Sequence, residues 1–271
     1  MASTKDFDFD RLAAAYDQVL PLTAPVTARM LELTTGIAAG TSVLDIACGT
    51  GEPGLTIAAS HPGVRLRGVD RAETMISVAR RKAEQRGLEA GYEVMDSEAL
   101  AVADDDADVV VSRFGLLSFG DSAAEAREVA RVLRPGGTFT IATWDATSKN
   151  TLTFVMASAV HDLLPPPLHA AMRRQEQLAM PGRREAWLTA AGLSGVTSEL
   201  FAWDVEFPDG DSLWELATGP AMLGAVLGGL GEEQLASARV EFDRLLADYR
   251  RADGSYSLPY ACRIISGSGR L

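Results

Sequence analysis

The chain has 271 residues, 47% of them hydrophobic, enough for one large α/β domain with an insertion or for a domain plus a smaller cap. Its formal net charge of −12 argues against nucleic-acid binding, which relies on basic patches. No uninterrupted apolar run approaches the roughly 20 residues of a membrane-spanning helix, and residues 1–10 lack the pattern of a secretory signal. We therefore expect a soluble, cytoplasmic protein with no nucleic-acid partner and no membrane span.

The N-terminal part of the chain, residues 10–38, has the pattern of one or two helices interrupted at Pro21 and Pro25. The chain then alternates between short apolar runs bounded by turn residues and helical stretches, which implies parallel strands joined by right-handed crossovers. The expected strands are Val43–Ala47, Val64–Val69, Tyr92–Met95, Val109–Ser112 and Thr138–Thr143, and the expected helices are Gly54–Ser60, Ala72–Arg86 and Ser122–Val132.

From residue 145 the alternation stops. Predicted helices at Thr151–Leu164 and Arg183–Ala190 are separated by a break at Pro165–Pro167. The later elements are a strand (Thr197–Phe207), a Gly-rich apolar patch (Met222–Leu230), a helix (Glu232–Arg251) and a last strand (Leu258–Ser266). Cys48 and Cys262 have neither disulfide-framework nor zinc-site spacing, so we expect two small buried residues and no metal site.

A glycine loop follows the first predicted strand. Gly49, Gly51 and Gly54 satisfy the G-x-G-x-x-G pattern, and Asp70 follows at the distance of a ribose-binding acid, which alone is a weak signal for NAD. Asp45 changes the interpretation, because a carboxylate beside the loop would repel a pyrophosphate. It would instead favour S-adenosylmethionine, which carries a sulfonium and an ammonium group. The alternative is that Asp45 only accepts hydrogen bonds from the backbone of the turn.

Several motifs in order resemble the class I S-adenosylmethionine-dependent methyltransferases, especially ubiquinone/menaquinone-biosynthesis-like and bacterial natural-product enzymes. The resemblance covers residues 10–144 well and the C-terminal half loosely. It rests on Val43–Gly51, Gly68–Asp70 with Met75, Met95–Glu98, Asp108–Phe119 and Leu133–Gly137. It implies a Rossmann-like, doubly wound, mostly parallel sheet of seven strands, with a helical cap inserted after the fifth strand.

The same resemblance divides the chain into four parts. Residues 1–40 would close over the cofactor, 41–145 would form the cofactor-binding core, 146–195 would form the cap and substrate region, and 196–271 would add the last strands and further cap helices. A homodimer stays open as an alternative to a monomer.

The resemblance also implies which residues bind S-adenosylmethionine and its product S-adenosylhomocysteine. They are Tyr16, Asp45, Ala47, Gly49, Thr50, Gly51, Asp70, Arg71, Met75, Asp96, Ser97, Ser112 and Arg113. Asp70 would accept from both ribose hydroxyls, or else cap the following helix. Asp96 would accept from the adenine amino group, or else be a solvated turn residue. Met75 and Tyr16 have core packing as their alternative, and Arg113 could face an acidic wall or the substrate.

The catalytic chemistry is less marked. Some related enzymes place histidines just after the fourth strand, but residues 114–119 contain none, so the base lies elsewhere or alignment suffices. His161, in the cap, is the candidate base, with His169 behind it and a structural role as the alternative. Apolar cap residues favour a small hydrophobic, aromatic, quinone-like or polyketide-like acceptor, methylated on oxygen or carbon. A cyclase or isomerase that retains the cofactor pocket is the rival function, and a pure binding module is disfavoured.

Overall fold

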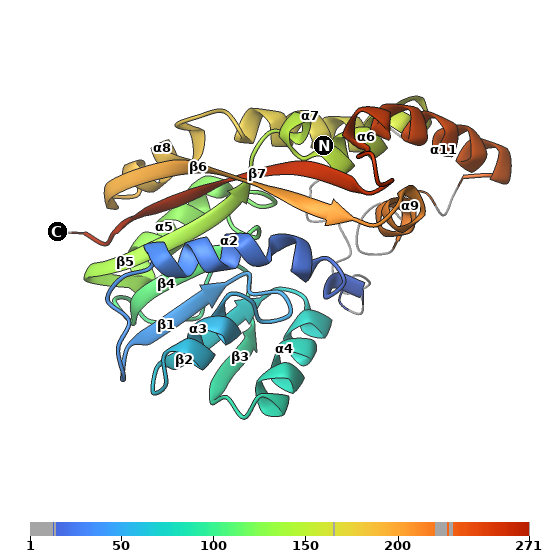
Figure 1. Cartoon of the computed structure of the whole chain (residues 1–271). Helices are drawn as coiled ribbons and strands as arrows, with labels where there is room; N and C mark the ends of the chain where they lie inside the picture. Colours follow the sequence, from blue (N-terminus) through green and yellow to red (C-terminus); the bar gives the residue numbers. More distant parts are fainter. Residues whose placement is uncertain (1–12, 14, 165, 220–226, 228–229, 271) are drawn as a thin grey trace. The chain divides into compact units, whose positions relative to one another are not determined.

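A seven-stranded sheet with the order β3-β2-β1-β4-β5-β7-β6 organises the structure, a computed structural model that describes residues 13, 15–164, 166–219, 227 and 230–270 (Figure 1). Parallel pairs join β1 to β2, β2 to β3, β1 to β4 and β4 to β5, while β7 runs antiparallel to β5. The seven-stranded, mostly parallel α/β sheet is therefore confirmed. The strands are β1 (Ser42–Ile46), β2 (Arg65–Asp70), β3 (Ala90–Val94), β4 (Ala107–Arg113), β5 (Leu133–Trp144), β6 (Ser194–Phe207) and β7 (Tyr256–Ser268).

Helices connect the strands. Because β1-α3-β2 and β2-α4-β3 step in one direction along the sheet and β4-α5-β5 steps in the other, right-handed crossovers place α3 and α4 on the face opposite α5 (Figure 1). The helices are α2 (Leu20–Leu33), α3 (Gly54–Ser60), α4 (Glu73–Gln85), α5 (Ser122–Val132), α6 (Thr151–Ala159), α7 (Pro166–Leu178), α8 (Arg183–Ala190), α9 (Gly210–Thr218) and α11 (Glu232–Leu246). Short 3₁₀ turns lie at Thr147–Lys149, His161–Leu163 and Ala247–Tyr249.

Proline positions account for two differences from the sequence prediction. Pro21 and Pro25 do not interrupt the N-terminal helix, since α2 runs through both. Pro21 stands in the first turn, where a backbone N–H has no partner to lose. Helix α7 begins at Pro166, inside the break predicted at Pro165–Pro167, and the sequence prediction missed this helix; Pro165 itself lies outside the described residues. A proline cluster marks the start of a helix as readily as its end.

Two smaller differences lie in the C-terminal part. Helix α9 was not predicted, although Asp209 caps it by accepting from the Ser212 amide. Helix α11 ends at Leu246 instead of Arg251, with a 3₁₀ turn after it.

The described residues fall into two units. The first comprises Met1–Trp144, Leu178–Phe201 and Cys262–Leu271, and the second comprises Asp145–Gln177 and Ala202–Ala261. The expected cap, 146–195, therefore divides between them, because α8 belongs with the first unit. The predicted patch Met222–Leu230 lies, apart from Leu227 and Leu230, outside the described residues.

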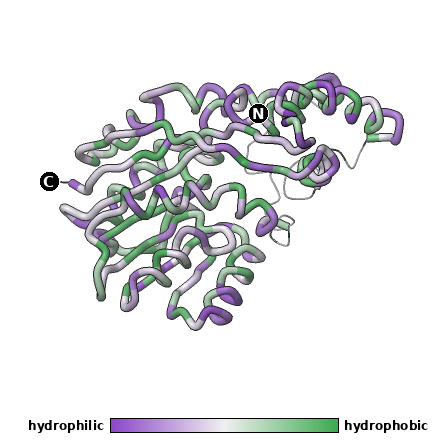
Figure 2. The backbone as a smooth tube through the Cα atoms, viewed as in Figure 1, coloured by the Kyte–Doolittle hydropathy of each residue, from purple (hydrophilic) through white to green (hydrophobic). Residues whose placement is uncertain are grey.

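The core of the first unit lies between the sheet and its helices. Strands β1, β4 and β5 contribute buried Leu44, Val110 and Ile141, which pack with Val129 of α5 and Leu188 of α8. Burying each such side chain stabilises the fold by roughly 1.5–3 kcal/mol. In Figure 2 hydrophilic residues follow the outer turns of α4 and α11. Both Cys48 and Cys262 are buried free thiols, as expected. Among the described helices, none combines the length and the apolar character needed to cross a bilayer.

Candidate active site

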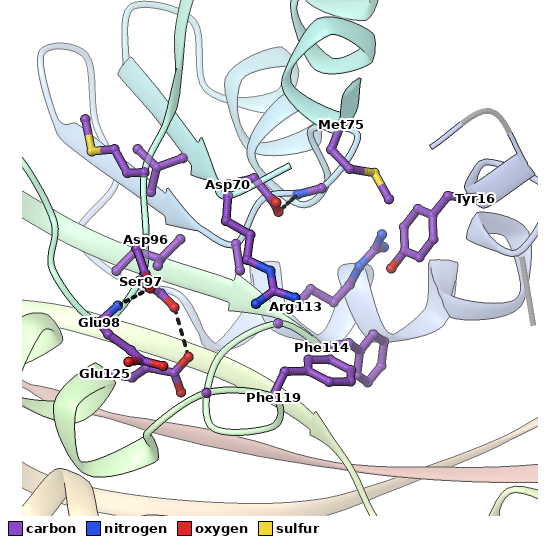
Figure 3. Close-up of a pocket in the computed structure, with 18 residues that line it drawn as sticks. Tyr16, Asp70, Met75, Asp96, Ser97, Glu98, Arg113, Phe114, Phe119 and Glu125 are labelled. Atoms are coloured by element: carbon purple, nitrogen blue, oxygen red, sulfur yellow. Dashed lines mark hydrogen bonds between the residues drawn. The ribbon is translucent and has the colours of Figure 1, made fainter. Parts of the chain in front are cut away.

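A pocket opens at the carboxyl ends of the central strands of the first unit, where β1 and β4 are neighbours and the chain leaves them in opposite directions. Such a switch point is where open α/β sheets bind ligands. Its lining comes from the segments that follow β1, β2, β3 and β4, together with Tyr16 and Glu125 (Figure 3). Nine of the predicted cofactor residues line it: Tyr16, Ala47, Gly49, Asp70, Arg71, Met75, Asp96, Ser97 and Arg113.

The glycine loop between β1 and α3 exposes backbone to the pocket at one position and packs tightly at another. Gly49 has a φ of +53°, and a Cβ atom there would meet only the Tyr16 ring, at 3.8 Å. Gly51 has a φ of +104°, and its Cβ would come within 2.6 Å of the Leu55 side chain. Glycine is needed at both, but only Gly49 lines the pocket.

Asp45 is fully buried behind this loop and does not itself line the pocket. Its Oδ2 accepts from the Gly54 amide at 2.9 Å, as the backbone alternative supposed, while its Oδ1 has no hydrogen-bond partner. Burial raises the pKa of Asp45 to about 7, against the lowering effects of the Gly54 amide and the Arg113 guanidinium. The carboxyl group is therefore poised to gain or lose its charge near neutral pH.

Asp70, at the end of β2, ties the loop to the next helix. Its Oδ2 accepts from the Gly49 amide at 2.9 Å (Figure 3). Its Oδ1 accepts from the Ala72 amide, also at 2.9 Å. The helix-cap alternative is wrong, because Ala72 and not Asp70 is the N-cap residue of α4 and no described side chain caps that helix. Burial raises the pKa of Asp70, while both amides oppose that shift.

Tyr16 and Met75 line the pocket beside Asp70, and they also belong to one small apolar cluster with Ala13 and Ala72. Burial raises the pKa of the Tyr16 phenol. These two side chains therefore both line the pocket and pack in the small apolar cluster.

Thr50 lies outside the pocket lining, and the structure shows what its hydroxyl does. The Thr50 hydroxyl donates to Asp17 Oδ1 at 2.7 Å, and Lys82 Nζ lies 3.1 Å from the same oxygen. Asp17 directly follows Tyr16, so this group fastens the N-terminal segment to the glycine loop and to α4.

The loop after β3 carries Asp96 and Ser97. Asp96 Oδ1 accepts from the Glu98 amide at 3.0 Å, and the Ser97 hydroxyl donates to Glu125 Oε1 at 2.9 Å (Figure 3). Asp96 is thus a turn residue by its own contacts and a pocket residue by its position.

The loop after β4 closes the pocket with aromatic side chains. Phe114 has a φ of +65° and stacks on Trp144 with ring centroids 3.9 Å apart. Ser112 faces inward from β4, outside the lining, and its Oγ accepts from the Leu116 amide. Arg113 is buried and donates to the Thr27 hydroxyl of α2.

His161 lies in the second unit, on an exposed 3₁₀ turn, with its ring edge-on to His169 at 4.6 Å between centroids. Trp203 stacks on Tyr260 and Trp214 contacts Phe242, so two of the aromatic residues expected in the cap pack within that unit. His61 lies at the end of α3, as a structural residue would.

Half of the residues that line the pocket were not predicted from the sequence. These residues are Ile46, Val69, Met95, Glu98, Phe114, Gly115, Phe119, Gly120 and Glu125. Most of them adjoin predicted site residues, so extending each motif by one position would have found them. Glu125 is different, since it comes from α5. The feature of the sequence that could have indicated Glu125 is its position, because it places a carboxylate on the apolar face of a predicted helix.

A family model described as a methyltransferase domain matches residues 43–137, which span the glycine loop through the start of β5. Among curated proteins, the chain is 42% identical over 95 residues to demethylmenaquinone methyltransferase of Thermus thermophilus, covering 35% of this chain and 43% of that protein. It is 35% identical over 133 residues to the ubiquinone/menaquinone biosynthesis C-methyltransferase of Bdellovibrio bacteriovorus, covering 48% and 57%.

The fold comparison reaches further along the chain. The structure of the Bacillus subtilis YcgJ protein covers 90% of this chain, and the match spans 98% of that protein, with a TM-score of 0.61 and 21% sequence identity. The sequence matches above stop well short of this, since they cover about half the length of the curated relatives. The family model falls on the N-terminal motifs, whereas the fold match extends over most of the chain.

Proposed function

The α/β core of this chain belongs to the class I S-adenosylmethionine-dependent methyltransferases, and from that premise we propose that the protein methylates an oxygen or carbon of a small hydrophobic acceptor. The observation that carries the proposal is the contact between Asp70 and the Gly49 amide at the pocket wall. This contact places the Asp70 carboxylate, which is of the kind that binds a ribose, next to the Gly49 backbone, so that both groups can bind one cofactor molecule.

The charges around the pocket fit this cofactor. Four carboxylates line it, from Asp70, Asp96, Glu98 and Glu125, against the two guanidinium groups of Arg71 and Arg113. The buried Asp45 Oδ1, which has no hydrogen-bond partner, adds an acceptor behind the glycine loop. An excess of acidic groups favours a sulfonium and an ammonium, and it disfavours the phosphates of NAD.

When bound, S-adenosylmethionine supplies a methyl carbon already activated by the sulfonium, and S-adenosylhomocysteine is the product. In this proposal Asp70 accepts from the ribose hydroxyls and Asp96 from the adenine amino group. The Gly49 backbone approaches the amino-acid part, where the charge of Asp45 acts. Apolar side chains such as Val69 and Phe114 exclude water from the pocket.

The structure constrains the identity of the acceptor less than that of the cofactor. The stacked aromatic residues Phe114 and Trp144 beside the pocket favour a planar, apolar acceptor. Names of the curated relatives point to quinone-like acceptors for those proteins, which supports the same class here. His161 is the proposed general base.

Rearrangement without methyl transfer is the second candidate, because no histidine is among the described residues that line the pocket. The two functions differ in what happens to the cofactor. We expect incubation with a panel of hydrophobic hydroxylated acceptors to give products heavier by one methyl group, with one S-adenosylhomocysteine released per product, by mass spectrometry. Product formation at an undiminished rate with S-adenosylhomocysteine bound would instead establish a cyclase or isomerase.

A further inference from the structure

A buried carboxylate joins two loops of the pocket wall. Glu125, in the first turn of α5, is 2% exposed. Its Oε1 accepts from the Ser97 hydroxyl at 2.9 Å and its Oε2 accepts from the Leu117 amide at 2.8 Å. Ser97 belongs to the loop after β3, and its bond to Glu125 is drawn in Figure 3. Leu117 belongs to the loop after β4, so Glu125 links the two loops, as does the Asp121 amide, which donates to Glu98 Oε1 at 2.9 Å.

Leu117 is held from its other side as well. Arg184 of α8 is 1% exposed, and it donates through Nε to the Leu117 carbonyl at 3.1 Å and through Nη1 to the Trp144 carbonyl at 3.2 Å. Leu117 has a φ of +59°, a left-handed conformation that is unfavourable for a residue with a Cβ. Such a conformation persists only where the surroundings determine it, and here two charged side chains bond both of its peptide groups.

The end of this loop is packed directly onto the carboxylates. A Cβ atom on Gly120 would lie 2.6 Å from Glu98 Oε1 and 2.9 Å from Glu125 Oε1. Gly120 and its neighbour Phe119 both line the pocket. A change in the position of Glu125 would therefore move lining residues of two loops together.

We propose that Glu125 is a positioning residue for the adenine end of the pocket, which sets the places of Ser97 and of residues 117–120, with Arg184 completing the arrangement. The inference rests on the proposed function, because that function places adenine beside Asp96 and Ser97. A carboxylate with a purely structural role would stabilise the fold without changing how tightly the folded protein binds its ligand.

Helix α5 offers a matched control. Glu128 lies one turn after Glu125, and its Oε2 likewise accepts from a backbone amide, that of Leu100, but it does not line the pocket. Calorimetric dissociation constants for S-adenosylhomocysteine and 5′-methylthioadenosine would be measured on the folded full chain. We expect Glu125→Ala to raise both constants at least about tenfold, the usual result of losing a charge-assisted bond. Glu128→Ala should leave both within about twofold, although each variant lowers the melting temperature.

The double variant Ser97→Ala/Glu125→Ala tests whether Glu125 acts through Ser97. We expect the double variant to bind no more weakly than Glu125→Ala, because Ser97 has already lost its place. Additive losses would mean that the two residues act independently and would overturn the inference. If Glu125→Ala does not fold, Glu125→Gln keeps the volume and one acceptor oxygen, and we expect a smaller loss in the same direction.

Unchanged affinity in a folded Glu125 variant would overturn the positioning role and leave the proposed function standing. Failure of the unmodified chain to bind either adenosine ligand would refute the proposed function itself, so the two failures are distinguishable.

Discussion

Asp70 bonds two backbone amides that belong to different parts of the pocket wall, one in the glycine loop and one at the start of α4. Its carboxylate would also accept from the cofactor ribose, and hydrogen bonds to a charged group contribute about 1.5–3 kcal/mol. We therefore expect Asp70→Ala to weaken binding of S-adenosylmethionine at least tenfold by calorimetry. Glu73→Ala is the control, since Glu73 is exposed in the first turn of α4 and outside the pocket lining. Equal affinity of the two variants would leave Asp70 with its backbone contacts alone.

Asp45 makes the stability of the protein depend on pH in a definite direction. Burial raises its pKa from 3.8 to about 7, so the folded state holds the proton more tightly than the unfolded state. The resulting stabilisation is fully present below pH 3.8 and is lost as the pH rises to about 7. The difference in pKa corresponds to up to about 4 kcal/mol.

The variant Asp45→Asn isolates this contribution from other titrating groups. We expect the free energy of unfolding of the unmodified chain to fall between pH 4 and pH 7 relative to that of the variant, measured by urea denaturation. Parallel stability curves for the two proteins would contradict the account of Asp45. A relative rise between pH 2 and pH 4 would mean that its pKa is depressed instead.

His161 is exposed on its 3₁₀ turn, next to His169, and histidine is the side chain that most often serves as a general base. If it deprotonates the acceptor, His161→Ala should lower turnover by roughly 10²-fold while cofactor affinity stays nearly unchanged. His61→Ala serves as the control, because the His61 ring contacts the Ile57 carbonyl at the end of α3. Full activity of the His161 variant would remove it from the mechanism, leaving alignment as the source of catalysis.

At the scale of elements, the N-terminal segment is held by one polar cluster, formed by Asp17, Thr50 and Lys82. Thr50→Val removes the hydroxyl at nearly constant volume. We expect hydrogen exchange of the amides of residues 18–20 to become roughly fivefold faster, equivalent to about 1 kcal/mol for one lost hydrogen bond. The matched control is Arg86→Met, which breaks the ion pair of Arg86 with Glu52 in the same loop. Equal exchange in both variants would show that the cluster does not fasten the segment.

The elements around the pocket could be predicted because each follows a local rule. Periodic apolar residues and turn residues marked α3, α5 and α8 at the bounds that the structure shows. The missed helix α7 begins at a proline cluster, which is an ambiguous signal in a single sequence. The roles of Glu125 and Arg184 depend on contacts between residues far apart in the chain. Arg184 bonds Leu117 across 67 positions, and no local pattern encodes such a contact.

For the site residues, too, local motifs predicted part of the arrangement, and contacts with neighbouring residues determine the rest. Asp70 and Gly49 were predicted from motif spacing, and the structure brings both to the pocket. Thr50 belongs to the same motif, yet its hydroxyl bonds Asp17 instead of lining the pocket, since the direction of a side chain in a turn depends on its neighbours. Asp45 likewise lies behind the loop.

At the scale of the whole molecule, the first unit contains a complete pocket, built from the ends of four parallel strands. The central claim is that this pocket binds S-adenosylmethionine and not a dinucleotide, because acidic groups outnumber basic ones around it. Calorimetric titration of the full chain with S-adenosylmethionine, S-adenosylhomocysteine and NAD tests the claim most directly. The account predicts binding of the first two at one per chain, with micromolar dissociation constants, and no heat with NAD. Clear binding of NAD, with no heat from either of the other ligands, would contradict it.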